Sequence, residues 1–488
     1  MSLIHRAVRG AAWNVATSLV ARVVSVIATL VITRYLSPDE YGEALGSILL
    51  VQVCLTLSQM GLPQYLLARP DSGPRVVFHI AFYTNLACVV ALAVVHLIRA
   101  RVGPFFSLHE LGRYLPWLTV TTFGESLAVV PERLLYRDLR FRVVALARAA
   151  ADLGFSVTAL ALARAGQGGM ALVYGGLLRV LLRLLVYSLQ IDWRASIRPC
   201  ALRWSTTREI FRFGLPLSVS VVAGSLSVRW DNMVTSRYFG AATMGVYNLA
   251  YSLSEVPVVN VGEQIGDVLL PSFARLPPDA RRAALSRSMA LIGLIVFPLA
   301  VGLAAVSPTL VEALFDPKWS RVAPMLSVLA VIAVTRPISY LVISYLQVSA
   351  RVVVVSVLEV TKVAILFTLM TLAAPSGMMA VCAAVGTAFL YHALVGLFVV
   401  TRDGLPFWGT LLRVGRPLLS TAPMAAAVFG ARWALAAAGL RAPWIRVVVE
   451  ISGGAVVYVG AASLLAGDTA RELISLTRAA ARRQRGAD

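Results

Sequence analysis

Ionised side chains interrupt the long apolar stretches of this chain, and their types indicate what chemistry it could do. Arginine can hold an anion through two parallel hydrogen bonds, and a buried carboxylate can take up a proton or a cation. The charged residues nearest the middle of the stretches are Arg22, Glu125, Asp152, Arg179, Glu255 and Arg336. Those somewhat farther out are Arg148, Arg183, Arg229, Asp231, Glu263, Asp267, Glu359 and Lys362.

Exposure of so many charges to lipid would be too costly for a stable fold. One charge at the centre of a lipid-facing helix costs about 2.5–3.5 kcal/mol. Six such charges would approach about 15–20 kcal/mol, more than the ~5–15 kcal/mol that usually keeps a protein folded. We therefore expect most of them to line a protein interior or a water-filled cavity.

Several charges also have a purely structural interpretation. Arg148 and Asp152 stand four residues apart, so they can form an ion pair on one helix face. Glu359 and Lys362 can pair in the same way at a spacing of three residues.

Other charges can be satisfied by a neighbour or by water. Asp231 follows Arg229 closely enough to form an interior pair with it. Arg432 and the pair Arg446/Glu450 lie near the outer ends of their stretches, where snorkelling to the surface would explain them.

Two arginines resist a structural explanation. Arg179 and Arg183 share a helix face and repel each other, so they require carboxylates, water or an anionic guest. Arg22 has no partner within its own stretch. Each of the three is therefore a candidate for a functional role.

The elements that must position these residues are membrane-spanning helices. Hydrophobic residues make up 58% of the 488 and charged residues 14%, and the mean hydropathy is +0.78. A hydrocarbon core about 30 Å thick needs roughly 20 apolar residues per helix. The sequence predicts an all-α membrane protein of about fourteen spans. These are 11–35, 43–67, 76–98, 114–136, 141–163, 169–190, 209–235, 243–270, 288–306, 322–347, 352–373, 378–401, 415–438 and 444–466.

The arginines predict the orientation of the chain in the cell (inner or plasma) membrane. Most lie in segments that are cytoplasmic if the N-terminus is inside, so the positive-inside rule places both termini in the cytoplasm. The net charge of +20 is then explained by short loops that face anionic lipid, which argues against nucleic-acid binding.

A sequence repeat predicts two lobes. Thr33-Arg34-Tyr35, seven residues before Gly42, reappears about two hundred residues later as Ser236-Arg237-Tyr238, seven residues before Gly245. Both copies lie between apolar stretches, which is typical of transporters built from two halves around a central cavity. The expected domains are an N-terminal lobe at 1–192, a cytoplasmic linker at 193–208, a C-terminal lobe at 209–401, and two further helices with a basic tail at 402–488.

Motifs of common enzymes are missing. The two lysines, Lys318 and Lys362, lie outside any Gly-Lys-Ser/Thr sequence, so a P-loop is excluded. The four cysteines show no CxxC spacing, and the five histidines are scattered without ligand spacing, so the sequence predicts neither a metal nor a cofactor. The loops are too short for a catalytic domain, which argues against an enzyme.

Several segments, taken in order, resemble the polysaccharide transporter family. They are Gly10–Asn14, Thr33–Gly42, Gly61–Tyr65, Pro131–Arg142, Arg229–Asn232, Gly245–Ala250, Leu270–Leu276 and Phe315–Trp319. These proteins are oligosaccharide flippases, related to the multidrug and toxin extrusion transporters, within the multidrug/oligosaccharidyl-lipid/polysaccharide exporter superfamily. The resemblance covers roughly 1–400 and fades in the last two helices.

The resemblance implies translocation of a polyprenyl-diphosphate-linked oligosaccharide to the outer leaflet by alternating access, coupled to a proton or sodium gradient. Arginine suits a diphosphate because its fork of N–H groups matches phosphate oxygens. The expected head-group residues are Arg22, Arg179, Arg183 and Arg336. The expected ion-coupling residues are Glu125, Asp152, Asp231 and Glu255.

Three alternatives stay open. A drug or small-solute antiporter of the same superfamily would favour an acidic, aromatic cavity over a cationic one. A membrane-embedded glycosyltransferase or polymerase would need longer loops and catalytic motifs, and a non-transporting scaffold would carry buried charges without use. Expected partners are the lipid-linked oligosaccharide, membrane lipid, and a glycan polymerase or glycosyltransferases of the same pathway.

Overall fold

The computed structural model describes residues 27–193, 197–274, 276–349, 351–440 and 442–475. Within them the chain is helical and contains no strand, which confirms the all-α prediction. Of the first predicted span only 27–35 is described, and it is helical; Arg22 lies outside the described residues. Among the described residues, ten helical segments are long and apolar enough to cross a membrane, so the chain is a multi-pass membrane protein. The count of fourteen stays a prediction.

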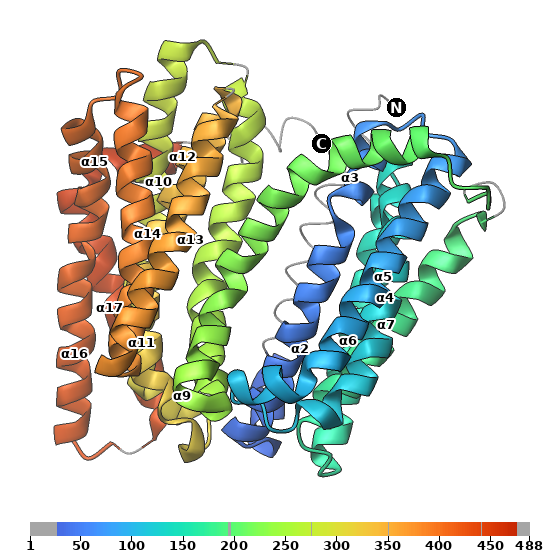
Figure 1. The fold of residues 1–488 in the computed structure, drawn as a ribbon. Coiled ribbons are helices and arrows are strands. Elements are labelled where there is room, and N and C mark those ends of the chain that lie inside the picture. The colour runs from blue at the N-terminus through green and yellow to red at the C-terminus, as the bar shows by residue number, and fades with distance from the viewer. Residues whose placement is uncertain (1–26, 194–196, 275, 350, 441, 476–488) are drawn as a thin grey trace, which may run out of the picture. The chain divides into compact units, whose positions relative to one another are not determined.

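Contacts divide the chain into two compact units, unit 1 at Met1–Val246 and unit 2 at Tyr247–Asp488. The lobe boundary expected at 193–208 stays a prediction. In unit 1 the helices form a bundle (Figure 1, blue to green). They are α2 (Pro38–Gln59), α3 (Leu62–Ala68), α4 (Pro74–Phe105), α5 (Leu111–Arg137), α6 (Phe141–Arg164), α7 (Met170–Gln190) and the first part of α9 (Trp204–Ala274).

Unit 2 contains the rest of α9 and the helices that follow it (Figure 1, yellow-green to red). They are α10 (Pro278–Leu314), α11 (Val322–Ala333), α12 (Thr335–Val348), α13 (Val352–Ala373), α14 (Met378–Thr401), α15 (Phe407–Leu419), α16 (Thr421–Ala437) and α17 (Pro443–Leu465). Its largest apolar core joins α10, α12, α13 and α14.

Helix α2 begins five residues before the predicted start of its span. Ser37 forms a capping box with Glu40, and Pro38 occupies the first helical turn, where its missing N–H costs nothing. The apolar pattern alone could not locate this start, because the first turn of α2 is polar.

The two copies of the sequence repeat pack on each other within unit 1. A Cβ on Gly42 would overlap the carbonyl group of Ala241, and a Cβ on Gly245 would lie 2.8 Å from the carbonyl oxygen of Pro38. Pro38 and Ala241 stand at equivalent positions of the repeat, so the contact is reciprocal. Gly240, with φ 82° and ψ 167°, makes the break in α9 that lets the second copy turn like the first.

A buried carboxylate secures the neighbouring turn. Glu43 accepts hydrogen bonds from the backbone N–H groups of His109 (2.8 Å) and Glu110 (3.2 Å), just before α5 begins. These groups have no partner within the helix, and the positive end of the helix dipole favours an anion there.

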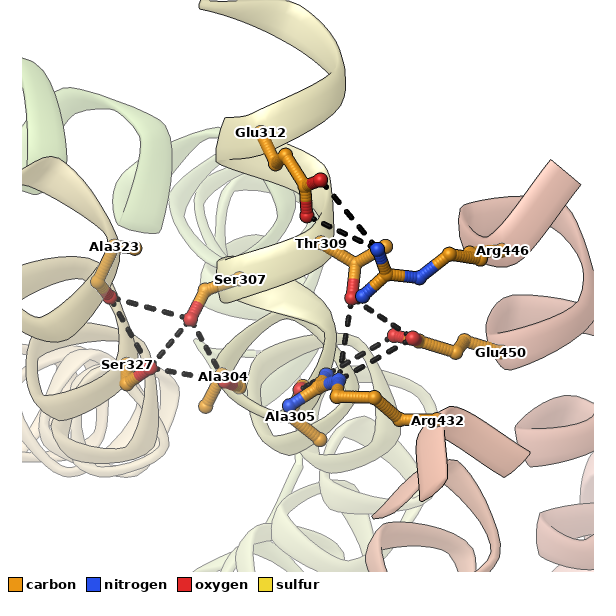
Figure 2. A network of polar contacts seen from close by, with 10 residues as sticks. All are labelled: Ala304, Ala305, Ser307, Thr309, Glu312, Ala323, Ser327, Arg432, Arg446 and Glu450. Carbon is orange, nitrogen blue, oxygen red and sulfur yellow. Dashed lines mark hydrogen bonds and ion pairs between the residues drawn. The ribbon is translucent and has the colours of Figure 1, made fainter. Parts of the chain in front are cut away.

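A buried polar network fastens α16 and α17 to α10 (Figure 2). The carboxylate of Glu450, which is fully buried, accepts from Arg432 at 3.0 Å and from the Thr309 hydroxyl at 2.8 Å. Arg446 reaches Glu312 at 3.2 Å instead of Glu450. The predicted Arg446/Glu450 pair is therefore wrong, as is snorkelling for Arg432, because each arginine forms an ion pair with a carboxylate on another helix.

We expect Glu450→Gln to destabilise the protein by about 3 kcal/mol, since Arg432 would lose its buried counter-charge. Thermal unfolding in detergent measures this as a lower Tm. Glu312→Gln is the matched control: Glu312 is half exposed, and its ion pair should contribute less than about 1 kcal/mol. Equal effects of the two substitutions would contradict the account.

Gly42→Ala should cost about 1–3 kcal/mol, because the new methyl group would overlap the Ala241 backbone. Gly112→Ala is its control, since a Cβ there meets nothing within 4 Å and Ala favours the helix. The same unfolding assay should show a lower Tm for the first variant and an unchanged or higher Tm for the second.

Candidate functional site

A cavity of about 260 Å³ lies within unit 1. It is bounded by the helix at 27–35 and by α2, α5, α6 and α7. Its walls combine apolar side chains with a small set of polar ones, as is usual for a ligand site. The polar residues that line it are Thr29, Tyr41, Gln52, Thr121, Thr122, Glu125 and Arg179.

Glycines bring the walls of the cavity close together. A Cβ on Gly175 of α7 would lie 3.0 Å from the ring of Phe155 on α6, and a Cβ on Gly154 of α6 would meet the Leu182 side chain. Such small residues allow two helices to approach closely in a membrane, where no hydrophobic effect drives them together. The charges on α6 and α7 are therefore held at short range.

Arg179 projects into this cavity and is only partly satisfied. Its Nε lies 3.1 Å from Oδ1 of Asp152, and its guanidinium lies 4.3 Å from the centre of the Phe155 ring. The Nε–H is buried and makes no hydrogen bond among the described residues, so the contact with Asp152 is an ion pair without hydrogen-bond geometry. Arg179 keeps donors that an anionic ligand could use.

Arg183, one turn farther along α7, has no carboxylate within ion-pair distance and no hydrogen bond in the described part of the chain. Its Nε is also buried. Glu125 on α5 likewise has no cation within 4 Å among the described side chains, although Arg183, Arg179 and Arg229 all act on it electrostatically. Arg133, Arg336 and Arg446 also have a buried unbonded Nε, and Arg133 shares the lack of an ion pair, so neither feature distinguishes Arg183. What distinguishes Arg183 is its position one turn from Arg179 and its electrostatic effect on Glu125.

The predicted pair Arg148/Asp152 is wrong. Arg148 donates at 2.9 Å to Glu132 on α5, and Glu132 also accepts from the Tyr187 hydroxyl at 2.7 Å. Asp152 is instead the partner of Arg179 on α7. Arg148 and Asp152 pair with residues on other helices instead of with each other, because these helices are close enough for an ion pair to join them.

Asp231, predicted to bind an ion, is 1% exposed on α9. It accepts from the backbone N–H of Asn232 at 2.8 Å and from the Asn232 side-chain amide at 3.0 Å. Arg229 acts electrostatically on Glu125, toward the interior of unit 1. Asp231 is therefore held by its neighbour's amide groups.

In unit 2, Arg336 and Glu255 were predicted for different roles, yet they form one ion pair. Arg336 also donates to the Tyr251 hydroxyl at 2.5 Å and lies 4.6 Å from the centre of the Phe389 ring. The predicted pair of Glu359 with Lys362 is confirmed, at 2.5 Å. Unlike Arg183, these cations have carboxylate partners within their own unit.

Comparison with known proteins identifies the family. A profile described as polysaccharide biosynthesis protein matches residues 31–324, more than half of the chain. The chain belongs to this family. The resemblance expected from the sequence is thereby confirmed.

Two relatives align with most of the chain. The lipopolysaccharide biosynthesis protein WzxC of Escherichia coli (strain K12) is 24% identical over 363 residues, 72% of each chain. The succinoglycan biosynthesis transport protein ExoT of Rhizobium meliloti (strain 1021) is 24% identical over 492 aligned positions, 96% of this chain and 95% of its own.

Solved structures share the fold of this family member. The lipid II flippase MurJ in an inward closed conformation matches with a TM-score of 0.76 at 13% identity, over 93% of this chain and 99% of its own. An inward-facing multidrug resistance transporter of the MATE family matches with a TM-score of 0.60 at 15% identity, over 82% and 96%. Identities this low establish the fold and no more.

Sequence reasoning missed Glu132, Glu43 and His392. Glu132 lies in one of the segments that carry the family resemblance. Its partners Arg148 and Tyr187 lie on other helices, so no local spacing predicts these contacts. Glu43 is a polar residue at the start of an apolar stretch. The backbone N–H group of His109, from which it accepts a hydrogen bond, lies 66 residues farther along the chain. His392 contacts Glu359, 33 positions earlier on another helix, which no local spacing reveals.

Arg183→Met should stabilise the empty protein by about 1–3 kcal/mol, because it removes an unpaired charge at bilayer depth. Arg148→Met is the matched control on the neighbouring helix and should destabilise, since it deprives Glu132 of its cation. Thermal unfolding of the two variants should shift Tm in opposite directions; a fall in both would show that Arg183 is structural.

Proposed function

We propose that this chain moves a polyprenyl-diphosphate-linked oligosaccharide from the cytoplasmic to the outer leaflet, in the biosynthesis of a cell-surface polysaccharide. Relatives named for lipopolysaccharide biosynthesis and succinoglycan transport support this, and the fold is shared with a lipid II flippase. In this proposal the chain is a transporter and not an enzyme.

The observation that carries the proposal is the state of Arg179 and Arg183. Arg179 and Arg183, one turn apart on α7, each have a buried Nε–H without an acceptor among the described residues, and Arg179 lines the cavity. A buried donor without a partner costs about 1–3 kcal/mol. A diphosphate would supply acceptors and negative charge together, and charge-assisted hydrogen bonds to it are roughly twice as strong as neutral ones.

The remaining predicted head-group residues fit different parts of this scheme. Arg22 is proposed from the sequence alone. Arg336 can reach an anion only by leaving Glu255, so binding of the head group there would free a carboxylate to take up a proton or sodium ion. This exchange is one way to link cargo movement to an ion gradient.

Among the other proposed ion-coupling residues, Glu125 is the strongest, because no cation lies within 4 Å of it among the described side chains. Asp152 is engaged by Arg179, and Asp231 by the amides of Asn232. Protonation of Glu125 would increase the net positive charge around Arg183 and favour anion binding.

The proposed setting is the cell membrane, with both termini in the cytoplasm and alternating access between inward-open and outward-open states. The lipid tail would stay in the bilayer while the polar head group crosses. A glycan polymerase or glycosyltransferases of the same pathway are the proposed partners.

Arg183→Met should reduce translocation of a polyprenyl-diphosphate-linked sugar in proteoliposomes by at least about tenfold, the loss expected from one charge-assisted contact. Arg113→Met, which removes an exposed arginine paired with Glu110, should leave the rate unchanged. Equal rates for Arg183→Met and wild type would remove Arg183 from the head-group site. Vesicles that export cationic drugs but never a lipid-linked sugar would establish the antiporter instead.

A further inference from the structure

Three titratable side chains on α13 and α14 form a second cluster, in unit 2. The Lys362 ammonium lies 2.5 Å from Oε2 of Glu359, and Nε2 of His392 lies 3.4 Å from Oε1 of the same carboxylate. The Glu359 carboxylate thus forms an ion pair with Lys362 and lies near the His392 imidazole without a hydrogen bond to it.

The His392 ring is held in an unsatisfied state. It is 3% exposed, and neither ring nitrogen has a hydrogen-bond partner among the described residues. The 3.4 Å separation from Glu359 exceeds the usual N–H···O distance of about 2.7–3.2 Å, and its geometry is not that of a hydrogen bond. A buried polar ring rarely lacks a hydrogen-bond partner, so we expect His392 to gain one in another state of the protein.

Lys362 lies near a second possible partner, the aromatic ring of Phe389. Its ammonium lies 5.7 Å from the centre of the Phe389 ring, within the range of a cation–π contact. The same ring already interacts with Arg336, at 4.6 Å. The flexible four-carbon stem of lysine allows a move from Glu359 toward this ring, whereas an imidazole on a short stem stays in place.

The ionisable groups near the cluster can be named for the described residues. The Glu359 side chain is 27% exposed and is the least buried of the three. Helix α11 has no titratable side chain. Among the described residues, the remaining titratable groups on α14 and on the helices that pack against it are Arg336, Tyr340 and Tyr345 on α12, Arg413 and Arg416 on α15, and Cys382 and Tyr391 on α14 itself.

We propose that His392, Glu359 and Lys362 form a proton-binding site in which a proton taken up by the imidazole draws Glu359 to His392 and releases Lys362 toward Phe389. The proton comes from water and adds to a ring nitrogen, while Lys362 stays protonated throughout. The cluster then changes from neutral to a net charge of +1. One carboxylate cannot neutralise two cations in a low dielectric, so the mobile cation is displaced.

The consequence for transport rests on the proposed function. Released Lys362 places a second cation beside the ring that Arg336 contacts, so proton binding would raise the affinity of unit 2 for an anion. Loss of the proton would restore the Lys362–Glu359 pair and weaken that affinity. The site would thereby couple a proton gradient to the movement of a negatively charged head group.

Direct detection of the bound proton tests the site without any cargo. The full-length protein, with ¹⁵N-labelled histidine in lipid nanodiscs, is titrated by NMR from about pH 5 to 8. The His392 signal is assigned as the one missing from His392→Gln. At the acidic end, the protonated fraction of His392 should fall in Glu359→Gln and rise in Lys362→Met, with wild type between them. Glu312→Gln, far from the cluster in sequence and half exposed, should match wild type.

Identical titration of His392 in all variants, or a ring that stays neutral in wild type and in Lys362→Met alike, would overturn the proton site. Transport in proteoliposomes then tests coupling: His392→Gln should abolish the acceleration that an imposed pH gradient gives wild type. Equal acceleration in that variant would overturn the coupling role. If wild type moves no lipid-linked sugar yet His392 titrates as described, the proposed function fails and the proton site stands.

Discussion

The cost of an ionised side chain in hydrocarbon governs how this bundle is assembled. Lipid cannot solvate a charge, so a charge at bilayer depth must find its partner within the protein. Most such charges do so by reaching a different helix, which fixes the spacing and rotation of both helices. Among the described residues, such interhelical pairs include Arg148–Glu132, Arg179–Asp152, Arg336–Glu255 and Arg432–Glu450. These pairs add directionality to an interior whose apolar contacts could otherwise slide.

Against this background, the exceptions are the positions for which we propose a function. Arg183 and Glu125 are charges of opposite sign in unit 1 that do not meet within 4 Å, although the protein would be more stable if they did. His392 in unit 2 is a buried ring that makes no hydrogen bond to any described residue, and it lies beside a carboxylate that Lys362 already binds. Such positions lower the stability of the empty protein. A binding site can have this property, because the ligand supplies the missing hydrogen-bond or ion-pair partner.

Backbone packing at the repeat works by a different principle. Gly42 and Gly245 bring two turns into direct contact, and the missing side chains are what make the contact possible. Each glycine faces the residue that is equivalent to the one its counterpart faces, so a local two-fold relation follows from the duplication itself. Asp231 does not follow this relation, because its equivalent in the first copy is Ala28.

The sequence by itself determined the helices, the membrane setting, the repeat and the family. Apolar runs of sufficient length leave no other way to satisfy the backbone in lipid, and the pattern therefore located most helix ends to within a few residues. Only the tertiary structure decided which charges meet. Arg148 and Asp152 have the spacing of an ion pair within one helix, yet each pairs with a residue on another helix. Glu450 likewise pairs with Arg432 and not with Arg446. An ion pair depends on distances in space, and these are set by how closely helices far apart in the sequence can pack.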